Sequence, residues 1–105
     1  MTKTLQQNAS FLKLLLKPVS NQQKKALLQT ASSCQVKALG EIVRNLLHGS
    51  ITLSKHQLTK LRRHKTTLRR IDAASLNKKK GLLTKNLTAI TTALSAAEPF
   101  LKKIL

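Results

Sequence analysis

Lysine and arginine side chains dominate residues 54–72, which read SKHQLTKLRRHKTTLRRID. Both side chains bind phosphate, and the planar guanidinium of arginine matches its geometry especially well. Arg62 and Arg69 are seven residues apart, so on one continuous helix they would stack along the axis. Arg63 and Arg70 repeat this spacing, and such rows of cations can follow a row of phosphates. The cations of this segment are Lys55, Lys60, Arg62, Arg63, Lys65, Arg69 and Arg70.

The charge of the whole chain is as one-sided as the charge of this segment. Its 105 residues include 20 lysines and arginines but only 3 aspartates and glutamates, which gives a formal net charge of +17. A basic helix is often no more than a solvated face, but 3 acids cannot balance 20 cations through salt bridges, so a polyanionic partner is expected. Phe11 and Phe100 are the only aromatic residues on which single-stranded bases could stack, so double-stranded DNA is the expected polyanion.

The sequence contains no recognisable catalytic or metal-binding constellation. Its carboxylates, Glu41, Asp72 and Glu98, lie far apart along the chain, and neither a glycine-rich phosphate loop nor a nucleophile motif accompanies them. Neighbouring histidines are eight residues apart rather than the four that would place two of them together on one helix face as zinc ligands. We therefore expect the chain not to be an enzyme, and we expect no metal and no cofactor.

The single cysteine and the hydropathy pattern restrict the cellular context. Cys34 cannot form an intramolecular disulfide, and we expect it to be a small buried side chain near a helix start. No uncharged apolar run reaches the ~20 residues that a transmembrane helix needs. No secretory signal pattern opens the chain. A soluble, intracellular protein is expected.

The elements that must position the cations are predicted to be helices. Leucine, alanine and lysine are abundant whereas aromatic residues are scarce, which favours helices over strands. Residues 1–7 are expected to fray, and Pro99 to open a last short helix. Between them, helices are predicted to begin at Asn8 or Ser10, after Ser20 (near residue 21), after Ser32 or Ser33, after Ser54 and after Ser75. The predicted fold is all-α, a compact bundle of four to six short helices with a basic surface formed by the fourth and fifth.

The spacing of apolar residues indicates which helix faces are buried. The helix after Ser33 is the strongest candidate for the core, because its apolar residues recur every three or four positions. They are Val36, Leu39, Ile42, Val43, Leu46 and Leu47. Gly49 follows at the position where a left-handed residue commonly ends a helix. The basic helix at 54–72 is expected to bury one seam, which consists of Leu58, Leu61, Leu68 and Ile71.

A second group of cations lies on the next predicted helix, residues 75–85. Its members are Lys78, Lys79 and Lys80, and they complete a set of ten candidate DNA-binding residues. We assign residues 1–85 to a helical DNA-binding domain. Residues 86–105 are nearly neutral at first and are interpreted as a C-terminal helical extension docked on the same core.

Three segments of the chain carry a family resemblance: QKKALLQTAS (23–32), VKALGEIVRNLLHGSITLSKHQLTKLRRHKTTLRRI (36–71) and SLNKKKGLL (75–83). Through them, residues 12–83 resemble a family of small basic proteins of Maverick/Polinton elements, adintoviruses and adomaviruses, which is compared with the small adenovirus core protein. The resemblance implies a late virion protein that packages double-stranded DNA, with nine of the ten cations, all except Lys55, as its contacts. The family's Gly-Gly-Phe-Leu-Pro-like apolar tail has no counterpart in residues 84–105.

The expected function is sequence-nonspecific binding and condensation of double-stranded DNA through contacts of lysine and arginine to phosphate. The expected location is the virion and host nucleus if the chain is viral, and the nucleus otherwise, and self-association is left open. One alternative is a surface-active protein that contacts anionic membranes through residues 11–17 or 100–105. Another is a sequence-specific helix-turn-helix regulator that uses residues 36–48 and 54–72, with His56 and Gln57 near the bases. A third is a scaffold module that binds an acidic protein.

Overall fold

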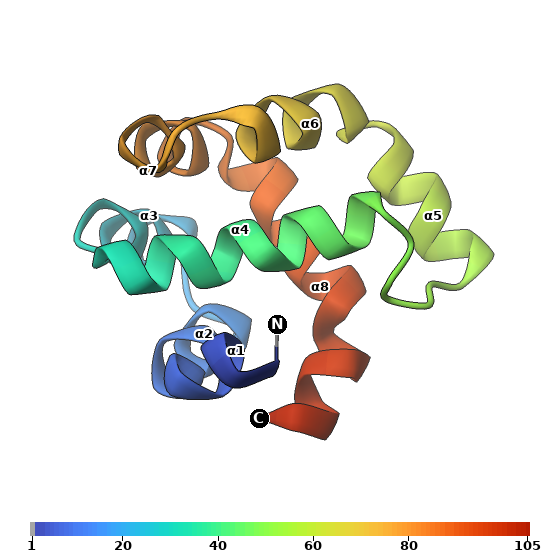
Figure 1. Ribbon diagram of the computed structural model, residues 1–105, viewed down its shortest axis with the longest axis horizontal. Coiled ribbons are helices and arrows are strands. Elements are labelled where there is room, and N and C mark those ends of the chain that lie inside the picture. Colours follow the sequence, from blue (N-terminus) through green and yellow to red (C-terminus); the bar gives the residue numbers. More distant parts are fainter. Residues whose placement is uncertain (1) are drawn as a thin grey trace.

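The computed structural model describes residues 2–105 and is all-helical over that range, as the sequence predicted (Figure 1). Its principal dimensions are 33 × 28 × 26 Å. The helices are α1 (Thr2–Gln7), α2 (Ala9–Leu16), α3 (Asn21–Gln29), α4 (Ser33–Leu47), α5 (Lys55–Arg62), α6 (Lys65–Ala73), α7 (Leu76–Lys85) and α8 (Leu87–Ile104). The number of helices in the described range, eight, exceeds the predicted four to six. None of these eight helices is long and apolar enough to cross a membrane.

Helix α4 lies in the middle of the fold, between two groups of helices (Figure 1). Helices α6 and α7 pack along one side of it. On the other side, α1 packs on α4 and also contacts α2. Helix α8 crosses α4 and contacts each helix from α2 to α7. Its buried face is rich in small residues, which let these neighbours approach closely. The small residues are Ala89, Ala93, Ala96 and Ala97.

Every helix contributes buried side chains to one hydrophobic core. The prediction for α4 is confirmed, because all of its predicted core residues are buried except Leu47, which is partly buried. Gly49 has a φ of +75°, the left-handed conformation expected at the end of this helix. The prediction for Cys34 is wrong. Its side chain is exposed, because it lies on the first turn of α4 beside the capping residues and not on the buried stripe.

Serine side chains start three of the helices as predicted. Ser20, Ser32 and Ser54 each form a capping box, in which the serine hydroxyl accepts a hydrogen bond from the backbone N–H three residues later. The residue at that third position is a glutamine in all three boxes, and its side-chain oxygen accepts a hydrogen bond from the backbone N–H of the serine. These reciprocal bonds satisfy N–H groups that a helix start otherwise leaves unpaired.

The two ends of the chain differ from their predictions. Residues 2–7 form α1 rather than a frayed end, and Leu5 is fully buried in the core. The side chain of Gln6 donates a hydrogen bond of 3.1 Å to the backbone carbonyl of Ile104, which joins the first helix to the last. At the other end, α8 continues through Pro99 instead of starting there. The ring of Pro99 lies on the exposed side, and burial of Leu101 beyond it keeps the helix docked.

The basic segment 54–72 is not the single helix that the sequence predicted. It breaks at Arg63 and His64, which form a turn between α5 and α6. The break follows from packing, because α5 packs against α8, whereas α6 packs mainly against α4. Leu61, Leu68 and Ile71 are buried as predicted, but Leu58 is 48% exposed, so the predicted apolar seam is not continuous.

Candidate nucleic-acid interface

Helix α5 presents the first group of predicted cations to solvent. Its capping box at Ser54 fixes the start of the helix, and the buried side chain of Leu61 holds one face against the core. Lys55, Lys60 and Arg62 are exposed on the remainder of the surface. Arg63, which is also exposed, lies at the C-terminal cap and so belongs to the turn rather than to the helix.

Helix α6 presents the second group, Lys65, Arg69 and Arg70, all of which are exposed. Its inner face is anchored by buried Leu68 and Ile71. Because α5 and α6 are separate helices, the predicted rows of arginines spaced seven residues apart do not form. The cations of 54–72 therefore lie on two short helices with a turn between them, and not along one straight axis.

The three lysines of α7 differ in their exposure and in the residues around them. Lys78 is exposed, whereas Lys79 and Lys80 are partly buried. The stem of Lys79 lies across α4, where its Cε and Nζ atoms are 3.6 Å from the position that a Cβ atom would occupy on Gly40. Lys80 borders a shallow hollow that also includes Ala31, from the link between α3 and α4, and residues of α4. The side chains of Lys79 and Lys80 are thus less accessible to a ligand than those of Arg69 and Arg70 on α6.

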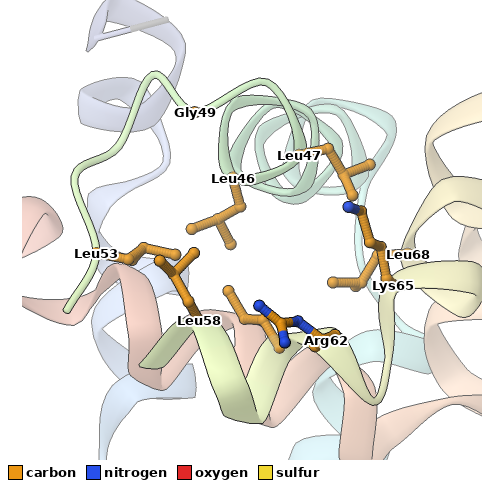
Figure 2. Close-up of a pocket in the computed structure, with 9 residues that line it drawn as sticks. Leu46, Leu47, Gly49, Leu53, Leu58, Arg62, Lys65 and Leu68 are labelled. Carbon is orange, nitrogen blue, oxygen red and sulfur yellow. The ribbon is translucent and has the colours of Figure 1, made fainter. Parts of the chain in front are cut away.

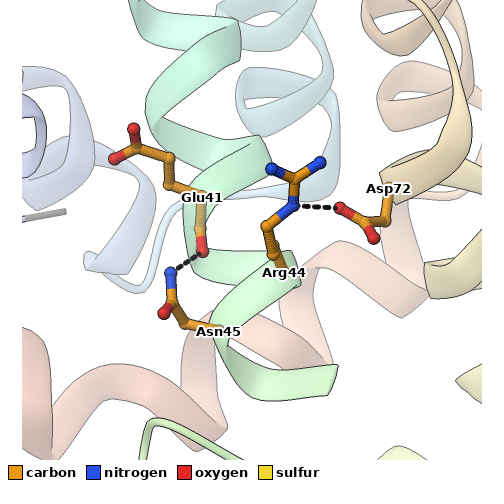
Figure 3. A network of polar contacts seen from close by, with 4 residues as sticks. All are labelled: Glu41, Arg44, Asn45 and Asp72. Carbon is orange, nitrogen blue, oxygen red and sulfur yellow. Dashed lines mark hydrogen bonds and ion pairs between the residues drawn. The ribbon is translucent and has the colours of Figure 1, made fainter. Parts of the chain in front are cut away.

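Two ion pairs occur among residues 2–105, and neither includes any of the ten predicted cations. Nε of Arg44 on α4 donates a hydrogen bond of 3.0 Å to the carboxylate of Asp72 on α6 (Figure 3). Lys102 pairs with Glu98 at 3.2 Å on α8. The remaining acid, Glu41, points away from Arg44, and its Oε2 is buried without a hydrogen-bond partner (Figure 3). The predicted cations therefore need not break an ion pair with another described residue before they bind an anion.

A polar hollow between α5 and α8 contains residues that the sequence interpretation missed. His56, Gln57 and Lys60 border it on the side of α5. The side of α8 supplies Thr91, Thr92, Ser95 and Ala96. Hydroxyl groups donate hydrogen bonds to phosphate oxygens, so Thr91 and Ser95 are suited to support a contact made by Lys60. The hydroxyl of Thr92 instead donates a hydrogen bond of 2.8 Å to the backbone carbonyl of Thr88. The signal was present in the sequence, since the hydroxyl residues of 88–95 recur every three or four positions, opposite the stripe of alanines.

The elements expected in a helix-turn-helix regulator have a different arrangement here. Seven residues, 48–54, separate α4 from α5, whereas the turn of that motif has three or four. Oε1 of Gln57 accepts a hydrogen bond of 3.1 Å from the backbone N–H of Ser54 in the capping box, which holds this side chain at the helix start. His56 is exposed.

The apolar segments that suggested membrane contact are largely taken up by the core. In residues 11–17, Phe11, Leu12 and Leu15 are buried, although Leu14 is exposed. In residues 100–105, Leu101 is fully buried, and the other apolar side chains are partly buried against the core. The apolar surface that either segment offers to a lipid is therefore small.

Within residues 2–105, no group of three histidine, cysteine, aspartate or glutamate side chains is arranged to hold a metal ion. Comparison of the chain with protein-family models, with curated proteins and with solved structures found no match. The candidate interface consequently rests on the geometry and charge of the chain itself.

Proposed function

We propose that this protein binds double-stranded DNA through its phosphates, without regard to base sequence, and condenses it. The observation that carries the proposal is the availability of the cations: eight of the ten predicted residues are exposed, and none is in an ion pair with another described residue. With a formal net charge of +17, the chain should gain binding free energy by releasing counterions from a polyanion.

The size of the molecule is compatible with that number of contacts. Duplex DNA carries one phosphate per about 1.7 Å of axis when both strands are counted. The longest dimension of the protein, 33 Å, therefore spans about 19 phosphates, and about half of them face a protein on one side of the duplex. Ten cations are enough to meet these phosphates, provided that the helices bearing them can face the same duplex.

Condensation requires more than one basic face, and the distribution of lysines supports this step. Helices α6 and α7 carry cations on one side of α4. Exposed Lys3, Lys13, Lys17 and Lys103 belong to α1, to α2 and its C-terminal cap, and to the end of α8, which lie on the other side (Figure 1). A molecule with cations on both sides can bridge two duplexes. The family resemblance points to the same role, and the corresponding location would be a virion and host nucleus, or the nucleus alone.

A salt titration with a random-sequence duplex tests the binding step. Fluorescence anisotropy between about 50 and 300 mM monovalent salt should give a steep, linear decrease of log K with log salt, with little change when the duplex sequence is altered. Light scattering with long DNA at low salt should rise as duplexes are bridged. Binding that is weak or insensitive to salt would refute the proposal. Tight binding without scattering would refute condensation alone.

A further inference from the structure

A pocket lined mainly by leucines lies where α4, the 48–54 link, α5 and the start of α6 meet (Figure 2). We call it the leucine pocket. Its volume is about 250 Å³. The wall residues are Leu46, Leu47, Gly49, Leu53, Leu58, Leu61 and Leu68, and two cations, Arg62 and Lys65, complete the lining.

The exposed leucine of the basic segment 54–72 is part of this pocket. Leu58 lies on the pocket wall and is 48% exposed. Arg62 at the end of α5 and Lys65 at the start of α6 border the same pocket, as their spacing of three residues allows (Figure 2). Neither cation is in an ion pair with another described residue. An apolar cavity thus lies beside two available positive charges.

This combination matches an amphipathic anion of small size. We propose that the leucine pocket binds an aliphatic carboxylate, with its chain among the leucines and its carboxylate at Arg62 and Lys65. The volume of 250 Å³ equals that of about eight water molecules in the liquid, at roughly 30 Å³ each. A methylene group is about as large as a water molecule, so the pocket suits a chain of about eight carbons. Charge-assisted hydrogen bonds from the guanidinium of Arg62 would fix the carboxylate end.

A protein partner fits this surface less well. A stable protein interface covers about 800 Å² on each partner. The other large apolar side chains that are exposed in the described range, Leu14 and Leu76, lie on α2 and α7 and are not continuous with the pocket. A phosphate group alone would use the two cations but would leave the leucine walls in contact with water.

The binding test uses the whole chain with leucine methyl groups labelled for NMR, titrated with octanoate below its micelle concentration at constant ionic strength. Saturable shifts should be confined to the six leucines of the pocket, whereas the core leucines Leu5, Leu12 and Leu101 should stay unchanged. Each added methylene should tighten binding about fourfold, so octanoate should bind about two-hundredfold more tightly than butanoate. Equal affinities for the two acids, or shifts spread over the whole chain, would overturn the proposal.

Two pairs of substitutions separate the pocket from general attraction to a cation. The double variant R62Q/K65Q should weaken octanoate binding at least tenfold, whereas R69Q/R70Q removes the same charge outside the pocket and should weaken it less than about threefold. Leu58→Gln, at a half-exposed position, should weaken binding without unfolding the chain. Equal losses in the two double variants would refute the site. The test involves no DNA, so its outcome is independent of the proposed function.

Discussion

The arginines of α5 and α6 allow the proposed DNA interface to be tested against a matched control. The test variant replaces Arg62, Arg63, Arg69 and Arg70 with glutamine, and all four side chains are exposed, so the core is untouched. We expect weaker binding to a random duplex and a flatter dependence on salt, because each phosphate contact contributes about −0.9 to the slope of log K against log salt.

The size of the effect follows from this slope. If all four arginines contact phosphate, the slope should fall in magnitude by about 3.6, since 4 × 0.9 = 3.6. Between 1 M and 100 mM salt, four phosphate contacts raise the affinity by about 10^3.6, or roughly four-thousandfold. The variant lacks these contacts, so at 100 mM salt it should bind more weakly than the parent protein by about this factor. Fluorescence anisotropy across the salt series measures both quantities, and circular dichroism checks that the variant stays helical.

The control variant replaces Lys3, Lys13, Lys17 and Lys103, which are also exposed, and so removes the same net charge from the other side of α4. These lysines should matter little for a first duplex bound at α5 and α6, because most of their field is screened beyond about 10 Å at 0.1 M salt. We expect the control to lose less than about tenfold in affinity. Equal losses in the two variants would show that net charge, and not this surface, governs binding.

The remaining predictions concern the fold. In urea titrations, Leu39→Ala should destabilise the protein by about 3–5 kcal/mol and Leu46→Ala by about 2–3 kcal/mol. The reason is that Leu39 is 1% exposed in the core, whereas Leu46 is 8% exposed and borders the leucine pocket. A larger effect for Leu46→Ala than for Leu39→Ala would contradict this packing. Gly49→Ala should lower the unfolding free energy by about 1–2 kcal/mol, because Gly49 has a φ of +75°. Gly81→Ala, on an exposed helical position with open space around it, should raise the unfolding free energy by up to about 1 kcal/mol. Thermal melts in which Gly49→Ala and Gly81→Ala shift the melting temperature in the same direction would refute the conformations assigned to the two glycines. Cys34 should react with a thiol reagent in the folded protein as fast as in the unfolded chain, and protection of the folded thiol would contradict its exposure.

Local signals in the sequence were sufficient to predict most helix starts and the central helix. Ser20, Ser32 and Ser54 could be recognised as caps because the chemistry of a capping box lies within four consecutive residues. The apolar period of α4 was equally informative, because almost every residue on that stripe is buried by neighbours on several sides.

Tertiary packing decided the features that the sequence did not predict. Residues 54–72 have a helical period throughout, and only the competing contacts of α5 with α8 and of α6 with α4 explain the break at His64. Similarly, α1 forms because Leu5 has a place in the core, which the short segment 1–7 did not reveal by itself. Pro99 was interpreted as a start, but burial on both sides of it keeps α8 continuous.

The candidate interface was predictable as a set of residues but not as a surface. Exposed cations such as Arg69 and Arg70 could be identified from composition and spacing, since charged side chains seldom enter a core. Their distribution over separate helices depended on the break. Arg62 and Lys65 are three residues apart, a spacing that places two side chains on one helix face, so their proximity was predictable. The pocket beside them was not, because it also needs the packing of α4 and of the 48–54 link.

The three capping boxes use glutamine at a position that glutamate can also fill, and no helix from α1 to α8 has an acid in its first turn. Glutamine has no proton to gain or lose, so these helix starts keep their hydrogen bonds in acid and in concentrated salt alike. The positive ends of the helix dipoles also stay unmasked by carboxylates. The chain thus stabilises these helix starts without a negative charge that would repel a polyanion.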